Sequence, residues 1–474
     1  MGFIRTILKY ILLLAVLAVA VFSVTIGIMF ISSSINQDNS LKVFGYSFYK
    51  FNENSEKVLT EIQNSDFTSI EVTTNHVNLH IQGTQETAAC MNIYNKMWGI
   101  VKTEKDAKYG VNYIIENNVL KITVSEPEGI YLNTTSSNLT IKLPKNFSTK
   151  ELKVNGVNSN IFIGNSDNNY LNVSKIALNV KNAKVSILKI KNDLSEVSLN
   201  SNNNITNITQ NISGTLTANT KISTINFNQA NTVNVTATNA KVDGNQATNI
   251  SIKSESGVLN IDNVNSVYLN GNIKTTIANL TGNYTDENRT SVKLSISNAT
   301  GSIQTKSTSG ETHIDNATQD INIQSTIGNI SVKNITSSLT IKTTSGICQV
   351  SYANNANQNA TFNFTAKNGS LTASNIQCQT NIQVETDGLC SVTAQFAKLI
   401  GNNIIRGQKG KINVTAVVEP CLLTVQSTGE KDINYAGVVK TENIESQSIS
   451  GASQSSATLQ LSATSGKITL KEQN

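Results

Sequence analysis

Three consecutive stretches of eighteen residues repeat one pattern: ATGSIQTKSTSGETHIDN (299–316), ATQDINIQSTIGNISVKN (317–334) and ITSSLTIKTTSGICQVSY (335–352). Apolar residues coincide at two places in the unit, first at Ile303, Ile321 and Leu339 and then at Ile314, Val332 and Val350. Each unit contains two alternating strands around a bend glycine, which is Gly310, Gly328 or Gly346. Because a unit this short cannot bury its own apolar face, neighbouring units must stack on one another. The repeat therefore predicts an all-β fold, a parallel β-solenoid (β-helix).

The same alternation continues outside the repeat and predicts a repetitive β-solenoid over 151–474. Short alternating strands occur at SKIALNVKNAKVSIL (174–188) and NISIKSESGVLNID (249–262), and glycines mark further bends at Gly369, Gly388, Gly410 and Gly466. Glycine and asparagine suit such bends because they accept a positive φ most readily. Asn-rich runs such as SNNNITNITQNISG obscure the pattern between about 195 and 250, so no rung is assigned there. We expect the polar end of the segment 457–474 to cap the open end of the stack.

Residues 66–150 predict an irregular N-terminal β region of the same solenoid domain. Strands with alternating polarity occur at SIEVTTNHVNLHIQG (69–83), VNYIIENNVLKITVSE (111–126) and SNLTIKLPKNF (137–147). They are longer than the later strands, and the breaks between them are less regular, which favours a different start to the stack.

An apolar run of 22 residues, 10–31, predicts one transmembrane helix. Arg5 and Lys9 precede the run, and the next basic residue is Lys42. The excess of positive charge before the run predicts a cytoplasmic N-terminus (1–9) and an extracytoplasmic remainder, beginning with a juxtamembrane segment over 32–65. The expected partner of 10–31 is the lipid bilayer, at the cell membrane. The length of the run favours an uncleaved signal-anchor over a cleaved signal peptide, and the sequence leaves cleavage open.

The segment LKVFGYSFYKF (41–51) concentrates aromatic residues just after the predicted helix. One interpretation is an aromatic collar at the membrane surface. The other, which the alternation at Phe44, Tyr46 and Phe48 favours, is a first strand or short helix that packs the base of the domain.

Composition and cysteine content exclude several classes of protein. The net charge of +5 is small for 474 residues and forms no Lys/Arg cluster beyond the N-terminus, so no nucleic-acid partner is expected. Five cysteines without a CxxC pair argue against a zinc cluster and a dense disulfide scaffold. Cys348 and Cys390 both follow a bend glycine by two residues, as Ile330, Leu371 and Ile412 do. That shared position predicts buried thiols two rungs apart, about 9–10 Å, and therefore not bonded to each other, since a disulfide rarely spans more than about 7 Å between Cα atoms.

The order of these segments resembles a known family, the bacterial putative-adhesin β-solenoid domains of membrane and surface proteins. The resemblance spans roughly 66–474 and rests on the run Leu139–Pro144 (LTIKLP) and on the Ser-Gly bends at 256–257, 309–310, 345–346 and 465–466. It implies an all-β solenoid at the cell envelope with adhesion or scaffolding as its role, and it supplies no catalytic residues. This chain departs from the family pattern in having more bends and an unusually Asn-rich sequence.

Candidate chemistry is sparse along the chain. His76 and His80 would stand about 13 Å apart on one face of a strand, too far to share a metal, and are interpreted as surface residues, while His313 occupies an outward position. The densest charged cluster is Asp286-Glu287-Asn288-Arg289, in an expected loop (282–290), where a solvated loop is favoured over an active site. Asp315 and Asp320 come from adjacent rungs at different positions. The chain contains no GxSxG, Walker or HExxH motif.

A ladder of Thr308, Thr326 and Thr344 could form a flat polar face that binds a repetitive glycan. Bend chemistry, with the hydroxyls bonded to local backbone, is the favoured alternative.

The sequence therefore predicts a membrane-anchored, extracytoplasmic, structural or adhesin-like surface protein that is not an enzyme. No catalytic, cofactor-binding or metal-binding residue is assigned, and no cofactor is expected. Partners beyond the bilayer would be a surface glycan, a protein ligand or other copies of the solenoid. Two alternatives stay open: a carbohydrate-active β-helix enzyme, which needs carboxylates converging in a groove, and a self-assembling envelope scaffold whose rods stack end to end.

Overall fold

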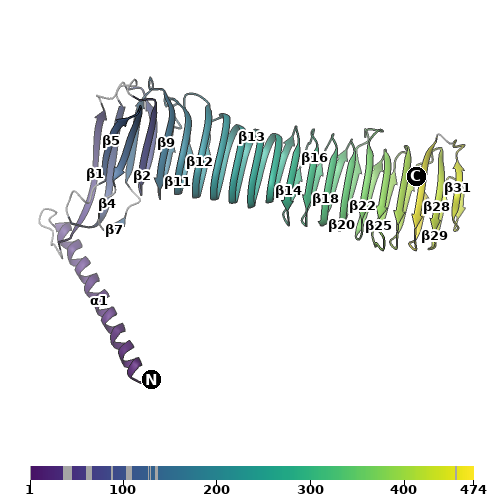
Figure 1. Ribbon diagram of the computed structural model, residues 1–474, viewed down its shortest axis with the longest axis horizontal. Coiled ribbons are helices and arrows are strands. Elements are labelled where there is room, and N and C mark those ends of the chain that lie inside the picture. The colour runs from purple at the N-terminus through teal and green to yellow at the C-terminus, as the bar shows by residue number, and fades with distance from the viewer. Residues whose placement is uncertain are drawn as a thin grey trace. The chain divides into compact units, whose positions relative to one another are not determined.

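The computed structural model describes residues 2–35, 45–59, 67–86, 89–102, 109–125, 128, 130–133, 137–453 and 456–473. The chain divides into two compact units, Met1–Ser213 and Gly214–Asn474 (Figure 1). Phe44 and the parts 36–44 and 60–65 of the predicted juxtamembrane segment lie outside the described residues.

The first unit begins with helix α1 (Gly2–Ile35), which contains the predicted span 10–31. Thr6–Met29, 24 residues long, is the one described helical stretch that is long and apolar enough to cross a membrane, and its most apolar window of 18 residues has a mean hydropathy of 2.9. The hydroxyls of Ser23 and Thr25 donate to the carbonyl oxygens of Val19 and Val21, each at 2.8 Å. The two polar interruptions of the run are therefore satisfied within the helix itself, so they do not spoil its apolar surface.

The β part of this unit starts with antiparallel strands. Strand β1 (Ser47–Leu59) pairs along its whole length with β4 (Ala89–Val101), which also pairs with β7 (Ile130–Asn133) and β8 (Asn138–Pro144), while β5 (Gly110–Glu116) and β6 (Val119–Ser125) form a hairpin. Residues 47–51 are therefore strand, as the alternation in the aromatic segment indicates.

Parallel stacking already operates within this first unit. One wall contains β6, β2 (Ser69–Asn75), β9 (Thr149–Val157), β11 (Val173–Ile187) and β12 (Leu194–Ile208). The second wall contains β8, β3 (Asn78–Thr84), β10 (Asn160–Ile163) and the later halves of β11 and β12. Inward residues of β2 and β3, such as Val72 and Leu79, are completely buried between the walls. The predicted boundary at 150 stays a prediction.

The second unit is a continuous parallel stack that opens with β13 (Ile212–Leu280). Buried apolar residues recur in β13 every 17 residues, at Leu216, Val233, Ile250 and Val267. These positions locate the rungs from about residue 212 onward, which the Asn-rich sequence did not allow to be assigned. The rungs extend the column of Val267, Tyr284 and Ile303, which pair in register.

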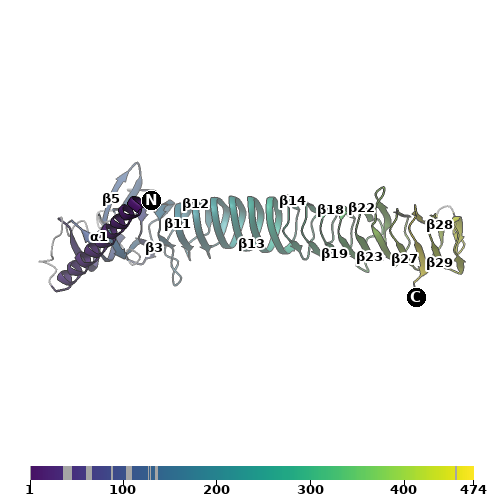
Figure 2. The ribbon, with the colours of Figure 1, turned by 90° about the horizontal axis from the view of Figure 1, so that it is seen from below.

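From β14 onward each rung contributes one strand to each of two walls. The first wall runs through β14 (Tyr284–Arg289), β16 (Ile303–Ser307), β18 (Ile321–Ile327), β20 (Leu339–Ser345), β22 (Thr361–Ala366), β24 (Gln379–Val384) and β26 (Asn402–Gly407). The second runs through β15 (Leu294–Ile296), β17 (Thr312–Asp315), β19 (Ile330–Ile335), β21 (Ile347–Tyr352), β23 (Ser370–Ile376), β25 (Ser391–Phe396) and β27 (Ile412–Ala416). Figure 2 shows the two series on opposite sides of the stack.

The register predicted from the triple repeat is confirmed. Ile303 pairs with Ile321 and Ile321 with Leu339, while Ile314 pairs with Val332 and Val332 with Val350. All six side chains are at most 3% exposed. Equivalent apolar residues of successive repeats therefore lie one above another, as the parallel β-solenoid requires.

Bends are closed by two kinds of ladder. A Cβ at Gly346 would lie 2.0 Å from the carbonyl oxygen of Gly328, so only glycine lets successive backbones approach this closely. At another corner, Asn298 and Asn316 adopt φ values of 46° and 55°. Their amides form a chain in which Asn316 Nδ2 donates to Asn298 Oδ1 (3.1 Å) and Asn298 Nδ2 to Asn279 Oδ1 (3.0 Å). Asparagine therefore both accepts the left-handed bend and links one rung to the next.

The far end of the second unit departs from the predicted order. Strands β32 (Ala457–Ala463) and β33 (Ile468–Glu472) lie between β26/β27 and the earlier β28 (Cys421–Ser427) and β29 (Lys431–Tyr435). The prediction that 457–474 caps the stack is therefore wrong, because both edges of this rung are paired and its inward residues Leu461 and Ile468 are buried. The outer rung instead carries the antiparallel strands β30 (Val438–Lys440) and β31 (Ile444–Ile449).

Candidate functional site

The charged cluster Asp286–Arg289 is the strongest candidate site, and it does not form the expected solvated loop. Asp286 and Arg289 belong to β14 and are 3% and 1% exposed. In a regular strand, positions three apart would face opposite sides of the wall. The pairing of β14 with β16 shifts register between these two residues, and Asn288 has a φ of 62°. This bulge turns both charged side chains into the core.

Arg289 is fully satisfied inside the stack. Its Nε donates to Asp286 Oδ2 (3.1 Å), and its Nη1 donates to the carbonyl oxygens of Val292 (3.0 Å) and Glu311 (3.2 Å). Its Nη2 donates to the hydroxyl oxygens of Thr305 (3.0 Å) and Thr312 (2.8 Å). A guanidinium has five N–H donors, so each has an acceptor.

Asp286 is equally well supplied with donors. The Tyr284 hydroxyl donates to Oδ2 (2.8 Å), the Thr305 hydroxyl to Oδ1 (2.8 Å) and the backbone N–H of Lys306 to Oδ1 (2.8 Å). Burial, together with the neighbouring carboxylate of Asp286, holds the pKa of Tyr284 well above its ordinary value, so this phenol stays protonated. Every polar group here is bonded to another, which is the arrangement of a structural network rather than of a site awaiting a reactant.

The histidines do not come together. His76 has a φ of 52° at the corner between β2 and β3, and its Nε2 lies 2.9 Å from Asn158 Nδ2. His80 lies in β3, stacked on Phe162 with ring centroids 4.6 Å apart, and burial lowers its pKa. The expectation that the two histidines share one strand face is therefore wrong, because the chain turns at His76, while both side chains are partly exposed. His313 faces partly outward in β17.

The other two candidate carboxylates, Asp315 and Asp320, are engaged locally. Asp315 Oδ1 accepts from Asn334 Nδ2 (2.9 Å), and Asp320 Oδ1 accepts from the backbone N–H of Ser338 (3.3 Å). Within the part of the chain that the structure describes, no three His, Cys, Asp or Glu side chains lie close enough to hold a metal ion.

Cys348 and Cys390 are buried thiols, but they do not share a position in the rung. Cys348 pairs with Leu371, and Leu371 pairs with Val392, so Val392 occupies the position predicted for Cys390. The sequence misplaced Cys390 because the bend after Gly388 is longer by two residues. Burial raises the pKa of Cys348 to about 12 and that of Cys390 to about 11.

The predicted threonine ladder exists as an exposed row. Thr308, Thr326 and Thr344 are exposed, and the latter two border a shallow groove of about 190 Å³ that Lys306, Gln324 and Lys342 also line. Neighbouring hydroxyls make local bonds, since Ser309 Oγ donates to the Thr290 carbonyl oxygen at 2.6 Å. The face is polar and open, with room for a ligand lying along the rungs.

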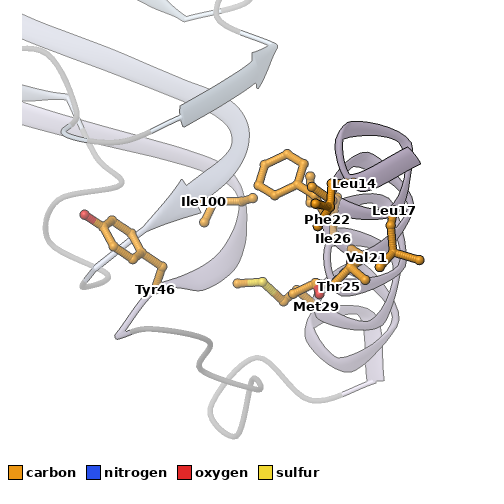
Figure 3. A pocket seen from close by; sticks show the side chains of 10 residues that line it. Leu14, Leu17, Val21, Phe22, Thr25, Ile26, Met29, Tyr46 and Ile100 are labelled. Atoms are coloured by element: carbon orange, nitrogen blue, oxygen red, sulfur yellow. Dashed lines mark hydrogen bonds between the residues drawn. The ribbon is translucent and has the colours of Figure 1, made fainter. Parts of the chain in front are cut away.

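A second, apolar groove lies in the first unit and was not anticipated from the sequence. It has a volume of about 570 Å³ and lies between α1 and the ends of β1 and β4 (Figure 3). Leu14, Leu17, Val21, Phe22 and Met29 line one side, and Tyr46 and Ile100 line the other. Met29 and Ile100 are only 3% and 7% exposed, and Ile26 packs against them.

Comparison with known proteins gives one family match. Residues 259–392 match the family model described as Toastrack DUF4097. No curated protein matches the chain.

Solved bacterial structures are similar to the chain at low identity. A "putative cell adhesion protein" from Clostridium sporogenes has 11% identity and a TM-score of 0.17, covering 89% of this chain and 100% of that one. A "putative adhesin" from Parabacteroides merdae has 15% identity and a TM-score of 0.19, covering 72% and 96%. TM-scores this low do not establish a shared fold. The β-solenoid fold of this chain is established by its own strand register. The resemblance to the adhesin-type β-solenoid domains is confirmed by the family match, which covers residues 259–392 of this chain.

Proposed function

We propose that this protein is a non-catalytic, membrane-anchored surface protein that presents a β-solenoid outside the cytoplasm in a structural or adhesive role. The observation that carries the proposal is the apolar surface of α1, because none of the most apolar window of Thr6–Met29 is buried within the protein. An apolar surface of this size is not left in water, and a bilayer is the cover that fits its length. Arg5 and Lys9 before the span support a cytoplasmic N-terminus.

The absence of a catalytic role is supported by the state of the charged groups. A glycosidase needs two carboxylates facing a substrate across an open groove. Asp286 is instead enclosed and saturated by its neighbours, and Asp315 and Asp320 are bonded to local groups. The open Lys306–Gln324–Lys342 face, bordered by the threonine ladder, suits many weak contacts with a polar polymer, so a surface glycan or protein is the proposed ligand class.

End-to-end assembly of the solenoid is less well supported. The outermost rung of the second unit is covered by antiparallel β30 and β31, and Glu445 on β31 is exposed. Charged side chains on an edge strand oppose the addition of another sheet.

Expression of the full chain in a bacterial host tests the anchor and its orientation. We expect the protein to stay with membranes after alkaline carbonate extraction. External protease should digest the β-solenoid on cells whose outer layers are permeabilised. Release of the chain by carbonate, or protection of the solenoid until the inner membrane is lysed, would refute the proposal.

A further inference from the structure

The apolar groove of the first unit combines a membrane-length helix with the end of a β-ribbon. Along α1, its lining runs from Leu14 to Met29, which is sixteen residues or about 22 Å of helix. Leu14, Leu17 and Phe22 are 57–65% exposed, so the groove is open rather than filled by the protein's own side chains. The groove wall is therefore part of the same surface that a bilayer would cover.

The β side of the groove lies beside the last turns of the apolar span of α1. Ser47 pairs with Val101, so the start of β1 and the end of β4 form one edge of the ribbon, next to Tyr46 and Ile100. Ile100 packs on Met29 and Ile26, within the last turns of the apolar span. If α1 spans a bilayer, this edge lies at the boundary between the acyl chains and the headgroups.

The rim of the groove carries one lysine and one tyrosine, Lys102 and Tyr46. Lys102 is exposed, and its Nζ lies 5.6 Å from the centroid of the Tyr46 ring. Tyr46 is 37% exposed, with an apolar ring at the groove. An apolar channel that ends at a tyrosine and a lysine matches the two parts of a phospholipid, an acyl chain and an anionic phosphate.

We propose that this groove holds a phospholipid of the bilayer, with an acyl chain along Leu14–Met29 and the phosphate at Lys102 and Tyr46. The proposal rests on the membrane anchor proposed above and adds to it that the base of the β domain sits in the lipid interface. A bound lipid would hold the edge formed by β1 and β4 against helix α1.

The test uses the full chain in proteoliposomes and a single tryptophan as a depth probe. Trp98 is the only tryptophan of the chain, so Trp98→Phe provides a silent background. Ile100→Trp places the probe in the groove, and Tyr46→Trp is a second probe at its rim in case the first disturbs folding. Glu86→Trp is the matched control. The pairings Thr84↔Pro144 and Cys90↔Lys142 put Glu86 near the start of β4, roughly ten residues or about 33 Å from Ile100.

Phosphatidylcholine brominated on its acyl chains should quench the Ile100→Trp or Tyr46→Trp probe at least threefold more than the Glu86→Trp control. Brominated phosphatidylglycerol, diluted into unbrominated phosphatidylcholine, should quench more than brominated phosphatidylcholine at the same dilution. One lysine near an anionic surface produces about a fivefold local enrichment. Lys102→Gln should remove that difference and leave the quenching by phosphatidylcholine unchanged.

Four outcomes contradict the inference or the anchor on which it rests. Equal quenching of the groove and control probes, in a protein that still floats with the vesicles, would show that the anchor exists and the groove holds no lipid. Quenching that appears only when the chain is diluted to one copy per vesicle would assign the groove to a second copy of the chain. Loss of flotation would instead overturn the membrane anchor itself. A preference for phosphatidylglycerol that survives Lys102→Gln would refute the role of Lys102.

Discussion

Removing one partner of the buried Asp286–Arg289 pair should destabilise the rungs around it severely. In Arg289→Met the Asp286 carboxylate keeps its bonds from Tyr284, Thr305 and Lys306 but loses its counter-charge at a site only 3% exposed. The carbonyl oxygens of Val292 and Glu311 lose their donors at the same time. Removing one partner of a buried pair costs about 3–5 kcal/mol. We expect a loss of this size in the opening free energy of this region.

Hydrogen exchange followed by mass spectrometry measures this loss locally, which matters because a repeat array can open without unfolding as a whole. A loss of about 3 kcal/mol corresponds to exchange more than about 100-fold faster, at 1.36 kcal/mol for each factor of ten. The acceleration should appear in peptides from β14 to β17 and should be far smaller in β28 and β29. Glu287→Gln is the matched control: Glu287 is adjacent in β14 but exposed, and surface changes stay within about 0.5 kcal/mol.

The double variant Asp286→Asn/Arg289→Met separates a charge pair from two independent contacts. Because each single change leaves the other charge uncompensated, the double variant should lose less than the sum of the singles, by roughly 1–3 kcal/mol. Additive losses, or a single-variant acceleration below about tenfold, which is about 1.4 kcal/mol, would refute the reasoning that the network is a buried, mutually dependent pair.

Three further predictions concern the glycine ladder and the cysteines. Gly346→Ala should lower the thermal unfolding midpoint far more than Gly437→Ala. A Cβ at Gly346 would lie 2.0 Å from the Gly328 carbonyl oxygen, whereas a Cβ at Gly437 would meet nothing within 4 Å. Equal midpoints of the two variants would contradict the close backbone approach. The five buried cysteines should fail to react with a thiol reagent in the native protein and react completely in denaturant, so rapid native labelling of Cys348 would contradict its burial. Because burial raises the pKa of Cys348 from 9.0 to about 12 and that of Cys390 from 9.0 to about 11, the unfolded state loses these protons first. The stability that these thiols contribute should be complete below about pH 9 and decline up to about pH 12, and urea midpoints across this range should fall less steeply in Cys348→Ala; an unchanged slope would count against the shift.

The triple repeat allowed the register to be predicted residue by residue, because apolar residues recur at a fixed spacing of eighteen. The rungs of β13 before about residue 250 escaped prediction because several of their buried positions hold small residues, such as Ala218, Ala230 and Ser223, which do not stand out in an Asn- and Thr-rich sequence. The local sequence also gave no sign that Asp286 and Arg289 point inward. Four consecutive polar residues are typical of a loop. The bulge at Asn288, which turns the Arg289 side chain to the same side as Asp286, depends on pairing with β16.

The sequence also could not indicate the order of the outer rungs, since spacing says which residues stack but not which rung is inserted where. The asparagine ladder was half predicted. Asn was expected at bends for its tolerance of positive φ, but the amide chain through Asn279, Asn298 and Asn316 appears only when successive rungs are aligned.

The insertion of β32 and β33 beneath strands made before them sets an order of events during synthesis. When β28 and β29 leave the ribosome, the strands on which they finally rest do not yet exist. The rungs at this end therefore cannot be added in the order of the sequence. The stack stays incomplete until β32 and β33 insert between β26/β27 and β28/β29. A chain interrupted before that point would present two unpaired sheet edges at once, one at β26 and β27 and one at β28 and β29.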